Sequence, residues 1–338
     1  MKKYLLLILI LVVSSLDNLM AQDVHFAQFN SAPMLTNPSF TGNFDSQYRL
    51  GLNARSQWRQ LANYQTLSFY GDVNLLQEAL DGDWVSVGLV AFMDKAGIAN
   101  LSATKIWLST AFHKSVNEFA HVSFGVNGGY VRRGIDESQL YFNSQWNEVE
   151  FDAGLPSGET LQNNSIAYFV LNAGLNLNIN FSPKSSFYAG ASIYNLNRPT
   201  ETFYDRLGAE EVNQLGLKPV LNVGGAFLKG TLSIEPAAYF TVEKKATELL
   251  VGANVAVISR SYNKRGTKLY FGTWYRLSDA IIPMVGIEYN NFKAMLSYDI
   301  TISPLRSAVG SKGGPEISII HVGGLSLSGS GKLSCPRF

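Results

Sequence analysis

Residues 48–55 read YRLGLNAR and alternate between apolar and polar side chains. Successive residues of a β-strand point to opposite faces of the sheet. A strand here therefore has one apolar face and one face that carries Arg49, Asn53 and Arg55. The next such stretch places Asp72 on its polar face in the same way. We predict that the apolar faces meet lipid and that the polar faces look into a hydrated or filled lumen.

The same alternation recurs along most of the chain. About fourteen stretches of about ten residues or more show it, which suits bilayer-spanning strands, and an even number suits barrel closure. They span residues 47–58, 63–75, 84–94, 101–113, 118–131, 164–181, 185–194, 217–228, 231–243, 247–259, 267–277, 279–289, 292–302 and 315–324. We predict an all-β fold, a transmembrane antiparallel β-barrel of about 14 strands over residues 46–325, with an irregular N-terminal segment.

The expected connections differ in length between the two ends of this barrel. Tight turns follow even-numbered strands, at residues 182–184, 229–230 and 290–291. The longest connections follow odd-numbered strands, at residues 132–163, 195–216 and 303–314. Outer-membrane barrels have short periplasmic turns and longer extracellular loops. The pattern favours such a barrel over a soluble sandwich or propeller and predicts that the long loops lie outside the cell.

Composition agrees with a membrane barrel. Hydrophobic residues make up 46% of the chain and charged residues only 16%, against about 25% charged in ordinary soluble domains. The formal net charge of +1 gives no basis for binding nucleic acid, which needs a basic face. The expected environment is outer-membrane lipid.

The first residues have the features of a secretory signal. Two lysines follow the initiator methionine, an apolar run covers residues 4–13, and a small residue stands at Ala21. This run is shorter than the ~20 residues that a membrane-spanning helix needs. We predict a signal peptide over residues 1–21, cleaved after Ala21 to leave Gln22 or Asp23 as the new N-terminus. A short N-terminal membrane anchor is the alternative.

Residues 22–45 do not alternate, and their prolines and glycine prevent a regular strand. Their apolar side chains need cover, so we expect this segment to fold against the periplasmic mouth or into the lumen as a plug. A flexible leader is the alternative. The expected plug or docking residues are Phe26, Phe29, Asn37, Pro38 and Phe40. The expected polar residues of the lumen are Arg49, Asn53, Arg55 and Asp72.

No constellation of catalytic or metal-binding residues stands out. The four histidines lack metal-ligand spacing, and the single cysteine, Cys335 in the tail 326–338, excludes an internal disulfide. Outer-membrane hydrolases place Ser and His on adjacent strands, so we consider Ser123 or Ser109 beside His121 or His113; alternation puts Ser109 and His113 on one strand face. A polar lumen produces such pairs in any case. We predict no enzyme activity, no cofactor and no metal. Candidate aromatic-girdle residues are Trp58, Trp84, Trp274 and Tyr275.

The N-terminal motif of the mature chain resembles that of a known family. QDVHFAQF at residues 22–29, Pro33 and NPSFTG at residues 37–42 are similar to the start of PorP/SprF proteins, barrels of the type IX secretion system of Bacteroidetes. Later blocks resemble further elements of that family: RSQW at 55–58, YQT at 64–66, LYFGTWYR at 269–276, LSYD at 296–299 and CPRF at 335–338. Pro315, at the expected start of the last strand, departs from the family's glycine-rich or aromatic entry.

This resemblance implies a non-enzymatic barrel of the bacterial outer membrane. Its members assist the secretion or surface anchoring of large adhesins or gliding-motility proteins, and the implied partners are the adhesin's C-terminal sorting domain and other type IX components. A channel or transporter for small solutes is the alternative function. The two differ in what fills the lumen, because a channel needs an open path and an anchoring platform does not.

Overall fold

The structure, a computed structural model, describes residues 26–58, 64–76, 80, 82–97, 99–136, 140, 142–152, 154–156, 164–203, 214–244, 246–259 and 266–324. The expected cleavage site at Ala21 and Gln22 lies outside the described residues, as does Cys335 in the tail.

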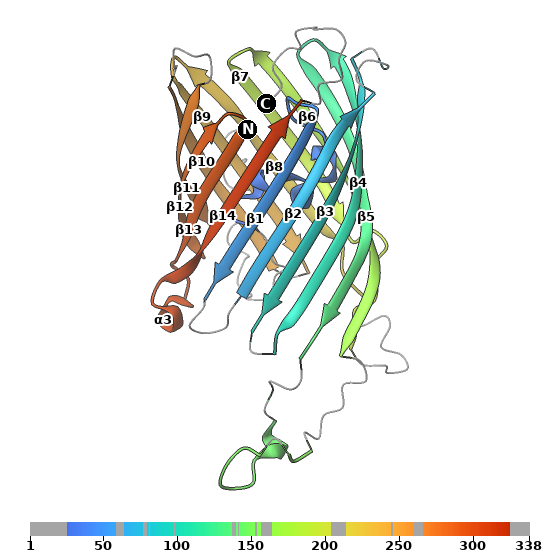
Figure 1. The fold of residues 1–338 in the computed structure, drawn as a ribbon, viewed down its shortest axis with the longest axis vertical. Helices are drawn as coiled ribbons and strands as arrows, with labels where there is room; N and C mark the ends of the chain where they lie inside the picture. Colours follow the sequence, from blue (N-terminus) through green and yellow to red (C-terminus); the bar gives the residue numbers. More distant parts are fainter. Residues whose placement is uncertain are drawn as a thin grey trace, which may run out of the picture.

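Fourteen antiparallel strands form one closed barrel, in which each strand pairs with its neighbours in sequence and β1 pairs with β14 (Figure 1). This confirms the predicted all-β barrel. The strands are β1(Tyr48–Gln57), β2(Tyr64–Leu75), β3(Trp84–Ala96), β4(Leu101–Asn117), β5(Ala120–Gly134), β6(Ser165–Ser182), β7(Ser185–Tyr194), β8(Lys218–Lys229), β9(Leu232–Glu243), β10(Ala246–Ser259), β11(Thr267–Arg276), β12(Ala280–Tyr289), β13(Phe292–Thr301) and β14(Lys312–Gly323).

The last strand differs most from its expected bounds. β14 begins at Lys312, so Pro315 lies inside the strand, opposite Tyr298, and not at its first residue. The register between β13 and β14 shifts between Asp299 and Ile300. Proline has no N–H to donate to the ladder, and irregular pairing of this kind accommodates it.

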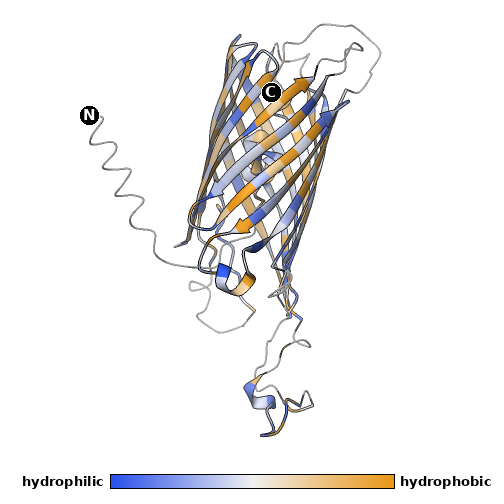
Figure 2. Cartoon of the chain, turned by 90° about the vertical axis from the view of Figure 1, so that its left-hand side faces the viewer, coloured by the Kyte–Doolittle hydropathy of each residue, from blue (hydrophilic) through white to orange (hydrophobic). Residues whose placement is uncertain are grey.

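The two faces of the wall are those that the alternation predicts. On β1, Leu50 and Leu52 are exposed on the outside of the barrel, 43% and 38%. Arg49, Asn53 and Arg55 are buried on the inside. Figure 2 shows hydrophobic residues recurring along the strands of the wall. Within the described residues, no helix is long and apolar enough to cross a membrane.

The longest connections all leave the same end of the barrel. They are residues 135–164 with η4(Asn143–Gln145), residues 195–217, and residues 302–311 with α3(Arg306–Val309). Figure 1 shows the first of these extending well beyond the barrel. Residues 183–184, 230–231 and 290–291 form tight turns at the opposite end. The asymmetry is not complete, because β9 and β10 are joined at the long-loop end by residues 244–245 alone.

Two tryptophans expected in an aromatic girdle lie inside the barrel. Trp84 is buried and its ring stacks on His113 with centroids 4.4 Å apart. Trp274 is buried, and its ring lies edge-on to that of Phe29 with centroids 5.4 Å apart. The girdle prediction is wrong for both, because their positions in the alternation put them on the inner face. Tyr275, the next residue, does face outward and is 37% exposed.

Candidate functional site

Residues 26–47, here called the inner segment, run through the interior of the barrel before entering β1. They contain three short helices, η1(Phe29–Ser31), α2(Pro33–Thr36) and η2(Pro38–Phe40), which Figure 1 shows enclosed by the strands. Pro33 and Pro38 begin two of these helices, at the position where a missing N–H costs nothing. Most of the segment is buried. The part of the chain whose sequence does not alternate therefore fills the lumen.

The Asn37-Pro38 turn is bonded into the wall. Asn37 is 0% exposed, and its Oδ1 accepts hydrogen bonds from the backbone N and the Oγ of Ser39, at 3.0 and 2.7 Å. Its Nδ2 donates to the carbonyl oxygen of Leu175 on β6 at 3.1 Å and to Oδ1 of Asn222 on β8 at 3.2 Å. One side chain thus both shapes the turn and anchors it to two strands.

Two paired glycines make room for this turn. Gly125 on β5 lies opposite Gly174 on β6 in the ladder. A Cβ at Gly125 would lie 2.4 Å from backbone atoms of Pro38 and Ser39, and a Cβ at Gly174 would lie 2.0 Å from Oδ1 of Asn37. Any larger residue would collide with the turn, so the inner segment packs directly on the backbone of the wall.

Thr41 is held by serine and histidine side chains of the wall. Its Oγ1 is 2.6 Å from Oγ of Ser109, and its carbonyl oxygen is 2.8 Å from Nε2 of His113. Since a carbonyl only accepts, Nε2 carries the proton and Nδ1 accepts from Oγ of Ser123 at 2.7 Å. His113 and Ser123 are both 0% exposed. Ser109 and His113 therefore bind the inner segment directly, Ser123 binds His113, and all three side chains are buried.

An ion pair secures the end of the inner segment near β1. Arg49 makes two hydrogen bonds to Asp72, of 3.1 and 2.7 Å, and donates to the carbonyl oxygen of Phe40 at 3.0 Å. Asp72 also accepts from the backbone N–H of Gly42 at 2.7 Å. Such two-pronged arginine–carboxylate contacts are among the stronger hydrogen bonds in proteins. Both charges are buried and satisfied by each other and by the inner segment.

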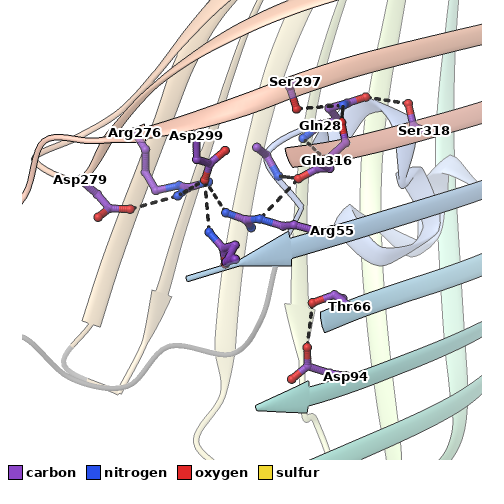
Figure 3. Close-up of polar contacts among 12 residues, drawn as sticks. Gln28, Arg55, Thr66, Asp94, Arg276, Asp279, Ser297, Asp299, Glu316 and Ser318 are labelled. Carbon is purple, nitrogen blue, oxygen red and sulfur yellow. Dashed lines mark hydrogen bonds and ion pairs between the residues drawn. The ribbon is translucent and has the colours of Figure 1, made fainter. Parts of the chain in front are cut away.

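A carboxylate on β14 binds the other end. Glu316 accepts hydrogen bonds from the backbone N–H groups of Ala27 and Gln28, both at 2.8 Å (Figure 3). The side chain of Gln28 donates to Oγ of Ser297 at 2.9 Å and accepts from Oγ of Ser318 at 2.6 Å. Gln28 was not expected at this site, although it lies in the block that carries the family resemblance.

Glu316 belongs to a cluster of buried charges. Asp299 accepts from Arg55 and, at 3.0 Å, from Arg276, and Arg55 Nε lies 3.6 Å from Glu316 (Figure 3). Arg276 also pairs with Glu248 at 3.3 Å. Opposite charges interleaved in this way compensate one another where single buried charges would be very unfavourable.

The structure places most of the expected site residues in the interior of the barrel. The ring of Phe26 packs on that of Phe92 with centroids 6.2 Å apart, and the ring of Phe29 lies 5.4 Å from that of Tyr239, centroid to centroid. Phe40 is only half-buried, with its ring edge-on to Tyr188 at 5.7 Å. The remaining expected residues, Asn37, Pro38, Arg49, Arg55 and Asp72, are buried. Asn53 is buried too, but its side-chain N and O have no hydrogen-bond partner among the described residues.

Two cavities remain beside the inner segment. The one toward the long loops has a volume of about 80 Å³, and the one lined by Glu235, Trp274 and Lys293 about 60 Å³. No group of three or more His, Cys, Asp or Glu side chains within the described ranges could hold a metal ion.

Comparison with known proteins gives a family. A family model described as "Type IX secretion system membrane protein PorP/SprF" matches residues 18–320. No curated protein matches the sequence. Among solved structures, the toluene transporter TodX of Pseudomonas putida is 10% identical over 89% of this chain and 98% of its own, with a TM-score of 0.49.

Two further structures are similar at the same low level. CymD, a monoaromatic hydrocarbon channel, is 12% identical over 93% of this chain and 97% of its own, with a TM-score of 0.45. CdiB of Acinetobacter baumannii is 9% identical over 82% of this chain, which spans 60% of CdiB, with a TM-score of 0.43. At these identities and scores, the likeness carries no argument about what passes through the barrel.

Proposed function

Because the chain belongs to the type IX secretion system membrane protein PorP/SprF family, we propose that it assists the secretion or the cell-surface anchoring of a large adhesin or gliding protein. It does so from the outer membrane as a barrel that catalyses no reaction. Its partners are the secreted protein or its C-terminal sorting domain, the surrounding lipid and other type IX components.

The observation that carries this proposal is the filled lumen. The inner segment is fixed at three places around the wall: Glu316 on β14, the Gly125–Gly174 pair on β5 and β6, and Asp72 on β2. A barrel whose lumen is closed by a segment bound through buried hydrogen bonds is consistent with a protein that binds a partner at its surface. It does not suit a channel for small solutes, which needs a continuous path.

The long-loop end offers surface for a partner. In the connection between β5 and β6, Trp146 and Phe151 pair in a bridge with ring centroids 5.1 Å apart, and both are about half exposed. Val149 between them is 82% exposed. Exposed aromatic side chains are enriched where proteins bind one another. This tip lies far from the wall (Figure 1) and supports contact with a protein outside the cell.

The test is to delete the gene and follow type IX-secreted proteins. Surface proteins are labelled on intact cells and quantified beside the culture medium and the cell interior. We expect one very large secreted protein to disappear from the surface and to return when the intact chain is supplied. Accumulation inside the cell would assign the barrel to secretion, and accumulation in the medium would assign it to anchoring. An unchanged surface, with loss of uptake of a small solute, would support the channel instead.

A further inference from the structure

A groove crosses the outer, lipid-facing side of the barrel where the first and last strands meet. Five outward-facing side chains of neighbouring strands lie in one row there, from β13 to β3 (Figure 1): Leu296, Ile317, Ala54, Leu67 and Met93. Four of them are large and 42–49% exposed, and Ala54 in the centre is the smallest. A short side chain between longer ones leaves a hollow, here called the wall groove, with a volume of about 540 Å³. The structure describes every residue that lines it.

The lining of the wall groove changes from apolar to polar toward the long-loop end. Two residues nearer that end on β1, β2 and β3, the outward-facing residues are Ser56, Gln65 and Lys95, which again lie side by side. Two residues of a strand span about 7 Å, so this polar row is about that much closer to the membrane surface along the strands. The groove therefore presents apolar and polar groups in the order in which a lipid carries its acyl chain and its headgroup.

Lys95 gives the polar end of the wall groove a positive charge. Its side chain is exposed, and no residue in the described part of the chain forms a hydrogen bond or an ion pair with its ammonium group. None of the residues that line the groove is a carboxylate. Arg55, the other cation of the lining, is buried and pairs with Asp299 on the inner face of the wall. The charge that the groove offers to a lipid is therefore that of Lys95, and lysines near a membrane surface attract anionic lipids.

The size and the position of the wall groove suit one lipid chain. Its volume of about 540 Å³ falls within the range of about 300–1,000 Å³ that is usual for sites of single small ligands. The apolar outer band of a membrane barrel is surrounded by hydrocarbon, and an extended acyl chain is narrow enough to follow a hollow one residue wide. Two barrels that meet are both convex, so a second copy would reach the floor of the groove through few side chains.

We propose that the wall groove binds one acyl chain of a lipid whose headgroup carries a negatively charged phosphate. The chain lies over Ala54, between Leu67 and Ile317, and the phosphate meets the ammonium group of Lys95 at the long-loop end. The lipid thereby covers the seam between β1 and β14, the two strands that close the barrel. This inference goes beyond the proposed function, because binding of a lipid here does not depend on which secreted protein the barrel serves.

The test uses the purified full-length barrel in an uncharged detergent and native mass spectrometry. The probes are dimyristoyl phosphatidylglycerol and dimyristoyl phosphatidylcholine, which have the same acyl chains and differ in the net charge of the headgroup. We expect the anionic lipid to bind about fivefold more tightly, the effect of one lysine near an anionic lipid, and Lys95→Gln to remove this preference. Ala54→Trp, which fills the hollow, should weaken both lipids about tenfold, as expected when about two methylene groups lose their contacts.

Lys229→Gln and Ala191→Trp are the matched controls. Lys229 is an exposed lysine at the short-turn end of β8, and Ala191 is an exposed alanine three residues from the long-loop end of β7, as Ala54 is on β1. Each control should bind both lipids as the unaltered chain does. Equal affinity of the unaltered chain for the two lipids, or groove variants that behave like their controls, would overturn the assignment. Dimers that are lost only in Ala54→Trp would assign the groove to a second copy instead. None of these results bears on the surface-display test, which alone decides the proposed function.

Discussion

Replacing Gly125 with alanine adds one methyl group at the point where the inner segment touches the wall. The new Cβ would start 2.4 Å from backbone atoms of Pro38 and Ser39, and ordinary contact begins at 3.4 Å. The turn must therefore retreat by about 1 Å, because neither backbone can give way cheaply. Such a shift would stretch the bonds from Asn37 to Leu175 and Asn222, now 3.1 and 3.2 Å, past hydrogen-bonding distance.

The energetic consequence can be sized from these two bonds. Each buried hydrogen bond contributes about 1 kcal/mol net, and polar groups left unpaired add about 1–3 kcal/mol. The free energy of docking of the turn should weaken by about 3–5 kcal/mol in total, which raises the population of its undocked state about 140- to 4,000-fold. Hydrogen–deuterium exchange reports this population directly, because an amide exchanges only when its hydrogen bond opens.

The assay compares exchange at residues 37–42 in the unaltered chain and in Gly125→Ala, with single-channel conductance in a planar bilayer as a second readout. Both should rise in the variant. Gly128→Ala is the control: it lies on the same strand but faces outward, away from the inner segment. Its Cβ would meet the side-chain tips of Leu171 at 2.8 Å and Phe169 at 3.1 Å, and the carbonyl oxygen of Val170 at 3.1 Å. Exchange that is unchanged in Gly125→Ala, or raised equally in both variants, would refute the docking of the inner segment on the paired glycines.

Three further predictions concern topology, facing and the buried charges. Single cysteines are placed at Val149 or at Asn290 in a chain without its native cysteine. A membrane-impermeant thiol reagent should label the first on intact cells and the second only after the outer membrane is opened. The reverse pattern would contradict the predicted orientation. Leu296→Arg should lower the amount of assembled barrel, since a cation on the lipid face costs ~2–4 kcal/mol at the bilayer midplane. Leu196→Arg, in a long loop, should not lower it. Equal yields of the two variants would contradict the assignment of Leu296 to the lipid face. Asp299→Asn leaves two buried arginines without their shared carboxylate. The free energy of unfolding should fall by about 3–5 kcal/mol, and the thermal unfolding midpoint measured on gels should fall with it. An unchanged midpoint would contradict the network of buried charges.

The positions of the strands could be predicted from the sequence because each strand separates lipid from lumen. A slip of one residue would turn every side chain to the wrong face, so the alternation is strict. The expected strand over residues 185–194, for example, is β7(Ser185–Tyr194). The same rule placed Arg49 and Asn53 inside. The prediction of an aromatic girdle was wrong for Trp84 and Trp274, because it relied on residue type and not on position in the alternation.

The contacts of the inner segment could not be predicted in the same way. Asn37 bonds to a carbonyl oxygen 138 residues away, and Ala27 bonds to a carboxylate 289 residues away. Which wall residues meet the segment depends on the register of β5, β6 and β14, which no local pattern specifies. The absence of alternation did indicate that residues 26–45 lie outside the strands, but not which wall residues they contact.

Position-specific crosslinking in living cells is the most direct test of the claim that the long-loop end of this barrel holds a secreted protein. A photo-crosslinking amino acid is placed at Leu215, which lines the cavity toward the long loops, and at Lys229, next to a tight turn at the other end. The account predicts a crosslink from Leu215 to one very large surface protein and none to it from Lys229. A barrel that crosslinks to that protein only from Lys229, or equally from both positions, would contradict it.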